Sequence, residues 1–292
     1  MGTIWELDFY SRPILDENNK KVWEVLICES PLQVDRPLSS LFRYAKFCSS
    51  QTVNSLWLRE ALEEAMVQSG QTPQKVRFYR RPLKNMIVKA CEDAGLTAVS
   101  SRRIYALNCW LQERLEQFYP QQPGYLATAA TSVAVQYPDI TSVRLPDALR
   151  GDKGDKWLFA SLTAADLAEM PDWDMAFGEG FPLTLARIDG DTPIPGVIVY
   201  AQRSLPLAAW MSGLEMGFVA LEAGAPPNLV LETGVSDRWI LAPLNRPELL
   251  AAAKQFEAAK KQANQAHFLA VQSGPESESF AGFWLLLQDE SQ

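Results

Sequence analysis

The order of strand-like and helix-like segments in the first 120 residues restricts the fold more than any other feature. Apolar and polar residues alternate in residues 4–13 and 21–28, and the polar turn "LDENNK" separates the two segments. This pattern predicts two antiparallel strands joined as a hairpin. Residues 40–48, "SLFRYAKFC", alternate well enough to predict a third strand.

Helices and strands then follow in turn. Apolar residues recur at helical spacing after Ser50, a predicted N-cap, and Gly70 is expected to end this helix. The remaining segments predict a strand, a helix, a strand and a helix over residues 74–81, 83–94, 96–101 and 104–118. The resulting order, β-β-β-α-β-α-β-α, is that of the ribonuclease H-like fold. We therefore expect a ribonuclease H-like domain, α/β-like in character, over residues 1–120.

The chain changes character after this domain. Residues 121–156 are rich in proline, glycine and small side chains, which is typical of a connecting segment. Residues 157–292 predict a mixed α+β domain, with a buried helix over residues 205–223 and a second helix over 245–265, capped by Asn245. Strands are expected in "KWLFASLT", "PGVIVYAQR", "NLVLETG", "RWILAPL", "HFLAVQS" and "FAGFWLLLQ". The whole chain is thus predicted to be of the α+β class.

Charge divides the chain unevenly. Residues 1–120 hold 16 Lys and Arg against 14 Asp and Glu, whereas residues 121–292 hold 11 against 21. An acidic protein has little non-specific attraction for nucleic acid or anionic lipid, so a polyanion site must be local. The most apolar run contains Glu215 and Glu222, so no membrane span is expected. With no secretory signal or transit peptide apparent at the N-terminus, we expect a cytoplasmic protein.

Cysteine and histidine usage argues against a metal or cofactor. The four cysteines are not spaced as zinc ligands, and His267 is the only histidine. We expect four buried free thiols and place His267 at the surface or at a helix cap. No catalytic or dinucleotide-binding motif occurs in the chain, and no cofactor is expected.

A basic segment offers the best candidate for binding. Its predicted RNA-binding residues are Lys75, Arg77, Tyr79, Arg80, Arg81, Lys84, Arg102 and Arg103. Arginine binds phosphate through two parallel hydrogen bonds, and tyrosine offers a stacking face for unpaired bases. In the predicted fold, the fourth and fifth strands are neighbours, so their two arginine pairs would share one edge of the sheet. The alternative is a set of solvated surface charges. A protein-assembly scaffold without RNA contact is then the hypothesis for function.

Asp8 raises the question of a metal site. A ribonuclease H-like nuclease holds two Mg²⁺ ions with several carboxylates, and Asp8, Glu60 and Glu63 could supply some of them. The fourth strand, however, ends in Arg80 and Arg81, where a further acid would be needed. We therefore favour a structural Asp8 that pairs with an arginine such as Arg12 or Arg80, and keep the nuclease as the rival hypothesis.

Two acidic segments are interpreted as structural. "EMPDWDMAFGEGFP" predicts a solvated loop anchored by Trp173 and Phe177, with an exposed aromatic pair for a protein partner as the alternative. "LETGVSDRW" brings Glu232, Asp237 and Arg238 into a tight turn, and we favour a role in holding a hairpin together over a substrate site.

Four segments carry a resemblance to a known family. "WELDFYSRPILDENNKKVWEVLICES", "LWLREALEEA", "QKVRFYRRPLKNMI" and "LETGVSDRWILAPLN" resemble the Tab-two/Atab-two family of cyanobacteria and plastids. The resemblance implies RNA binding that supports translation of photosystem reaction-centre messages, and so photosystem biogenesis. It carries over no catalytic residue.

The resemblance and the charge pattern together indicate partners and a location. The expected ligand is a messenger leader, single-stranded or containing A and U. The acidic second half would be available to protein partners. The expected location is the cyanobacterial cytosol, or the plastid stroma for plant relatives.

Overall fold

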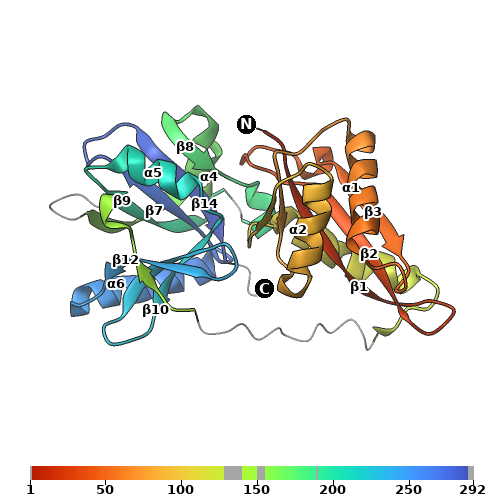
Figure 1. Ribbon diagram of the computed structural model, residues 1–292. Coiled ribbons are helices and arrows are strands. Elements are labelled where there is room, and N and C mark those ends of the chain that lie inside the picture. Colours follow the sequence, from red (N-terminus) through yellow and green to blue (C-terminus); the bar gives the residue numbers. More distant parts are fainter. Residues whose placement is uncertain (1, 128–139, 150–154, 189, 289–292) are drawn as a thin grey trace. The chain divides into compact units, whose positions relative to one another are not determined.

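The computed structural model describes residues 2–127, 140–149, 155–188 and 190–288. The chain forms two compact units (Figure 1). Unit 1 comprises Met1–Ser30 and Leu38–Asp139, and unit 2 comprises Pro31–Pro37 and Ile140–Gln292. Within unit 2, the backbone nitrogen of Gly180 donates to the carbonyl of Leu32, at 2.9 Å. Two separate stretches of chain therefore build each unit, which the sequence did not predict.

Unit 1 is built on one five-stranded sheet in the order β3-β2-β1-β4-β5. Its strands are β1 Ile4–Leu15, β2 Lys21–Glu29, β3 Arg43–Cys48, β4 Lys75–Phe78 and β5 Ala98–Ser100. The first three strands are antiparallel, whereas β4 pairs in parallel with both β1 and β5. The predicted sequence of strands and helices is observed. The ribonuclease H-like assignment rests on this topology alone and stays a prediction.

Three helices accompany this sheet. They are α1 Ser55–Ser69, α2 Lys84–Asp93 and α3 Tyr105–Glu113, which continues into a π-helical turn at Arg114–Phe118. The first helix begins after Asn54 rather than Ser50, because the Asn54 Oδ1 accepts a hydrogen bond from the Trp57 backbone nitrogen at 2.9 Å. Gly70 ends it as predicted, in the left-handed conformation with φ of 66°.

Alternation along β1 separates two kinds of interior. Trp5, Leu7 and Phe9 pack into the apolar core that α1 and α2 cover. Glu6 and Asp8 point to the other face of the sheet, which α3 covers. Both faces of the central strands are therefore buried, one against apolar side chains and the other against a mixture of apolar and ionised groups.

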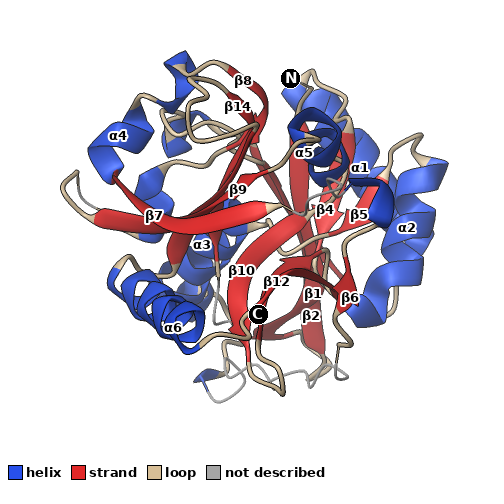
Figure 2. Cartoon of the chain, turned by 90° about the vertical axis from the view of Figure 1, so that its left-hand side faces the viewer, coloured by secondary structure: helices blue, strands red, loops and turns tan. Residues whose placement is uncertain are grey.

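Unit 2 contains two sheets. One has the order β7-β9-β13-β14-β8 and the other β10-β11-β12-β6. The strands of the first are β7 Lys156–Thr163, β8 Met175–Glu179, β9 Pro193–Tyr200, β13 Ala266–Gln272 and β14 Phe280–Leu287. Those of the second are β6 Val143–Arg144, β10 Met216–Glu222, β11 Asn228–Thr233 and β12 Asp237–Pro243. The helices are α4 Ala164–Ala168, α5 Ser204–Ser212 and α6 Pro247–Gln262, of which α6 packs beside β7 and β10 (Figure 2).

Three predictions for unit 2 are wrong in detail. The buried helix predicted over residues 205–223 ends at Ser212, and the rest of the run forms β10, which pairs with β11. A run of mostly apolar residues has no regular polar positions whose spacing would separate helix from strand. The acidic segment contains β8, which runs parallel to β14. Helix α6 follows Arg246, and Asn245 does not cap it.

His267 is buried, and its predicted place at the surface or at a cap is wrong. Its Nε2 accepts a hydrogen bond from the Val219 backbone nitrogen at 2.8 Å, and its Nδ1 lies 3.0 Å from the Gln265 carbonyl. Lys260, also buried, donates from Nζ to the Val219 carbonyl at 2.7 Å. The two side chains thus occupy the backbone groups that the outer strand β10 would otherwise leave unpaired.

The cysteines follow the prediction with one exception. Cys28, Cys48 and Cys91 are buried free thiols, whereas Cys109 on α3 is exposed. Position 109 falls on the outward side of an amphipathic helix, although apolar residues precede and follow it. In the described part of the chain, no helix has both the length and the apolar character to cross a membrane.

Candidate nucleic-acid interface

The carboxyl ends of β4 and β5 lie side by side in unit 1. Phe78, the last residue of β4, is in register with Ser100, and the Ser101 backbone nitrogen donates to the Phe78 carbonyl at 2.9 Å. The pair Arg80 and Arg81 therefore leaves the sheet next to the pair Arg102 and Arg103. This is the juxtaposition predicted from the order of the strands.

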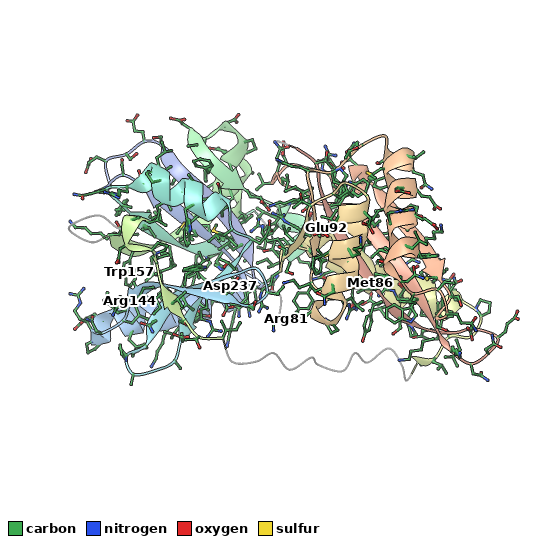
Figure 3. The ribbon with its side chains drawn as sticks, in the orientation of Figure 1. Arg81, Met86, Glu92, Arg144, Trp157 and Asp237 are labelled. Atoms are coloured by element: carbon green, nitrogen blue, oxygen red, sulfur yellow. The ribbon has the colours of Figure 1, made fainter. Side chains whose placement is uncertain are left out.

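Five of the predicted residues form an accessible group at this place, which we name the basic edge. It consists of Tyr79, Arg80, Arg81, Lys84 and Arg102, all of them partly or fully exposed. Lys84 opens α2, and Figure 3 shows Arg81 close to that end of the helix and Glu92 towards the other. The edge thus presents three guanidinium groups that follow two neighbouring strand ends and one ammonium group from the start of α2.

Three predicted residues lie elsewhere. Arg77 and Arg103 are buried, with exposed fractions of 1% and 3%, so the prediction that they form part of an accessible surface is wrong. Because β4 is covered on both faces, the side chain of Arg77 points into the interior, where its Nη1 donates to Ser30 Oγ at 3.3 Å. Lys75 begins β4 and pairs with Ile4, at the opposite end of the strand from Arg80.

Asp8 is held between two arginines, as the structural interpretation predicted. Its Oδ1 accepts a hydrogen bond from Arg80 Nε at 2.7 Å, and its Oδ2 forms an ion pair with Arg12 Nη1 at 2.8 Å. Burial opposes ionisation of this carboxyl, but the positive charges of Arg12 and Arg80 outweigh it, so the pKa of Asp8 is lowered. Asp8 is therefore an ionised carboxylate with both oxygens engaged by cations.

The structure does not bring the rival metal-binding residues together. Glu60 and Glu63 are exposed on α1, which covers the sheet face opposite to Asp8. Glu63 pairs instead with Arg59 on the next turn of the same helix, at 3.4 Å. Among the described residues, no group of three His, Cys, Asp or Glu side chains is placed to share a metal ion.

The ion pair of Asp8 continues into the interior. Arg12 Nε donates to Glu24 Oε2 at 3.2 Å, and Glu24 in turn accepts hydrogen bonds from Arg114 and from the hydroxyl of Tyr119. Burial raises the pKa of the Tyr119 hydroxyl, and the negative charge of Glu24 raises it further. The aspartate and arginine of the opening motif are thus links in a buried chain of charges.

One residue of this region, Tyr10, lies outside the predicted basic segment. Its side chain is 37% exposed, and the guanidinium carbon of Arg80 lies 3.9 Å from the centre of its ring. The basic segment contains only residues that are close together in the sequence. Tyr10 is distant from them in the sequence, but β1 lies next to β4 and brings Tyr10 to Arg80. Phe78 and Tyr105, two aromatic residues that lie close to the basic segment in the sequence, are buried.

The acidic turn of unit 2 holds a hairpin together. Glu232 and Arg238 are in register across β11 and β12, and Arg238 Nε donates to Glu232 Oε1 at 2.5 Å. Arg238 also pairs with Glu222 of β10 at 2.9 Å. Asp237, labelled in Figure 3, is exposed at the start of β12.

Comparison with known proteins places this geometry in a family. The family model "RNA-binding protein Tab2/Atab2 N terminal" matches residues 4–114, and the model "RNA-binding protein Tab2/Atab2, C-terminal domain" matches residues 132–287. The chain belongs to the Tab2/Atab2 family. The resemblance of the four motif segments is thereby confirmed, and the basic edge lies in the part of the chain that the N-terminal model covers.

Two relatives support the assignment to the Tab2/Atab2 family. A protein of Zea mays named "Protein TAB2 homolog, chloroplastic" is 38% identical over 290 residues, which is 97% of this chain and 71% of the maize protein. The protein of the same name from Arabidopsis thaliana is 35% identical over 291 residues, or 97% of this chain and 74% of that protein. No solved structure matches this Tab2/Atab2 chain.

Proposed function

We propose that this Tab2/Atab2 chain binds RNA through its basic edge and supports translation of messages for photosystem reaction-centre subunits, and so photosystem biogenesis, without catalysing a reaction. Membership in a family of RNA-binding proteins supports the first part. The names of the two relatives place them in chloroplasts. The role in photosystem messages rests on the resemblance alone.

The observation that carries RNA binding is the juxtaposition of arginines at the carboxyl ends of β4 and β5. In a chain with net charge −8, a local group of cations is the part that attracts a polyanion. Arg81 and Arg102 supply flat guanidinium groups that bind phosphate through paired hydrogen bonds, and Lys84 adds a mobile charge. The proposed ligand is a messenger leader, single-stranded or containing A and U.

The acidic second half has a different proposed role. Residues 121–292 hold 21 Asp and Glu against 11 Lys and Arg, and this excess of negative charge repels RNA. We assign it to contacts with protein partners. The proposed location is the cytoplasm of a cyanobacterium, with the plastid stroma as the counterpart in plants.

The experiment is a binding titration of the whole protein with a labelled messenger leader over a range of salt concentrations. Neutralisation of Arg81, Lys84 and Arg102 together to glutamine should weaken binding about tenfold or more and should lower the salt dependence by about 0.7 for each lost phosphate contact. The matched control neutralises Lys20, Lys21 and Lys254, which are exposed elsewhere.

Two results would contradict the proposal. One is equal binding by the two triple variants, since the control loses the same charge away from the basic edge. The other is Mg²⁺-dependent cleavage of the RNA by the wild-type protein that disappears in Asp8→Asn. That second result would establish the rival nuclease, and the same gel reveals it.

A further inference from the structure

Tyr10 is an aromatic ring held firmly at the surface of unit 1. The edge of its ring meets Trp23 with the ring centres 5.6 Å apart and the planes at 60°. The guanidinium of Arg80 lies over the ring, 3.9 Å from its centre. With 37% of its surface accessible, Tyr10 combines a fixed orientation with room for a ligand.

Arg80, a member of the basic edge, is itself fixed by an ion pair. Its Nε is engaged by Asp8, and Asp8 is held in place by Arg12. Its side chain is 24% exposed, and its flat face is occupied by Tyr10. Arg80 therefore keeps the tyrosine ring in place. Arg81 and Arg102, which are partly exposed, and Lys84, which is exposed, are the other cations of the basic edge.

The chemistry of the ring determines what it can bind. A flat, partly exposed aromatic ring next to several cations offers stacking to a nucleic-acid base whose backbone follows the cations. A base inside a duplex has both faces covered by its neighbours, whereas an unpaired base has a free face. The ring lies beyond the end of β4, on the strand next to it, and is therefore a neighbour of the basic edge.

We propose that Tyr10 stacks on one unpaired base of a bound nucleic-acid strand, and that Arg80 and Asp8 are positioning residues for this ring. The inference rests on the proposed function, because the strand is held by the basic edge. It adds the contact that would favour a single strand over a duplex. Asp8, the carboxylate that a nuclease would use to bind a metal ion, here orients the Tyr10 ring through Arg80.

The test uses the full chain and an oligoribonucleotide of about 15 uridines with one central 2-aminopurine, alone or annealed to its complement. Stacking quenches the fluorescence of 2-aminopurine, so one titration reports affinity and stacking together. Tyr10→Ala should bind the single strand about 5- to 100-fold more weakly, with little quenching and an unchanged salt dependence. Tyr10→Phe should bind within about 2-fold of the wild type, because it keeps the ring.

Two further variants complete the design. Phe47→Ala removes a ring of similar exposure, 41%, from β3, which β2 separates from the strand of Tyr10, β1. It should leave binding and quenching unchanged. Arg80→Lys keeps the charge but loses the flat face over Tyr10, so it should reduce quenching more than it reduces the salt dependence.

The outcomes separate this inference from the proposed function. The stacking role is overturned, while RNA binding stands, by either of two results. One is that Tyr10→Ala binds the single strand as tightly as the wild type does. The other is that Tyr10→Ala loses affinity for single-stranded and duplex RNA to the same degree. If the wild type binds neither RNA, both proposals are overturned. Thermal unfolding of each variant establishes that the protein compared is folded.

Discussion

Asp8 and Arg80 join the first strand of unit 1 to the residues that follow β4, through a hydrogen bond of 2.7 Å between Oδ1 and Nε. Since Arg12 holds the second oxygen, the carboxylate balances two guanidinium groups at once. Removal of its charge takes away the carboxylate that Arg80 pairs with and leaves Arg12 with Glu24. The pair is therefore more costly to break than an ion pair at the surface.

Asp8→Asn should lower the free energy of unfolding by about 3 kcal/mol at neutral pH, because it strands buried or partly buried charges. Urea denaturation measures this change. The control, Glu63→Gln, removes an exposed partner of Arg59 and should change stability by less than about 0.5 kcal/mol. Equal stability of the two variants would show that Asp8 does not hold this part of the sheet.

The pH dependence of the Asp8 effect has a definite sign. The pKa of Asp8 is lowered in the folded protein, so the folded state binds its proton less readily than the unfolded state does. The stability that Asp8 contributes is present above about pH 4 and is lost as the pH falls through the lower folded value. The difference between the wild type and Asp8→Asn should therefore shrink in acid, as urea denaturation at a series of pH values would show.

Glu6 of β1 accepts a hydrogen bond from the first turn of α3. Its Oε2 accepts a hydrogen bond from the Leu107 backbone nitrogen at 2.8 Å, and its Oε1 accepts one from Ser30 Oγ at 2.7 Å. Glu6→Gln should lower the free energy of unfolding by about 1–2 kcal/mol. The amide nitrogen of glutamine faces a donor that needs an acceptor, and the substitution removes the negative charge that is favoured at the start of a helix. Glu17→Gln, in the exposed turn after β1, is the control.

Because His267 is the only histidine of the chain, a change of stability near pH 6 can be assigned to it. Burial, and secondarily the charge of Lys260, lowers the pKa of His267 well below 6.5. The unfolded state then binds a proton that the folded state does not, so stability should fall as the pH drops below about 6.5. His267→Gln should be less stable at pH 8 by about 1–3 kcal/mol, and its stability should lose this dependence between about pH 7 and 5.5. An unchanged slope in the variant would contradict the assignment.

Two adjacent lysines provide a matched comparison in α6. Lys260 is buried, with Nζ bonded to the Val219 carbonyl at 2.7 Å and to Gln288 Oε1 at 2.6 Å, whereas Lys261 is exposed. Lys260→Ala should cost about 2–4 kcal/mol through a cavity and an unpaired carbonyl. Lys261→Ala should cost less than about 0.5 kcal/mol. Hydrogen exchange of the amides in β10 would locate the loss.

The sequence predicts strands well where alternation is strong and one face is apolar. Trp5, Leu7 and Phe9 mark β1 in this way, and the order of segments around it leads to the observed pairing of β4 with β5. Alternation fails in β10, because both faces of the run from Leu205 to Ala223 are apolar and the change from helix to strand after Ser212 leaves no periodic signal.

The candidate site was predictable in its backbone and only in part in its side chains. Neighbouring strand ends place the two arginine pairs together, and this follows from topology. Buried Arg77 donates to Ser30, which follows β2 and in turn donates to Glu6 of β1. The role of Tyr10 depends on its contact with Arg80 from beyond the end of β4. Contacts between segments far apart in sequence decide such cases, and local patterns carry no signal for them.

Residues Pro31–Pro37 belong to unit 2, although the segments before and after them belong to unit 1. Truncation at one position therefore cannot separate the two units. A fragment that begins at residue 140 would lack Leu32, and the backbone nitrogen of Gly180 would lose its acceptor. A fragment that ends at residue 139 would carry seven residues whose neighbours are missing. Deletion of either half therefore damages both, so point substitutions such as those above are the appropriate way to divide the functions of this chain.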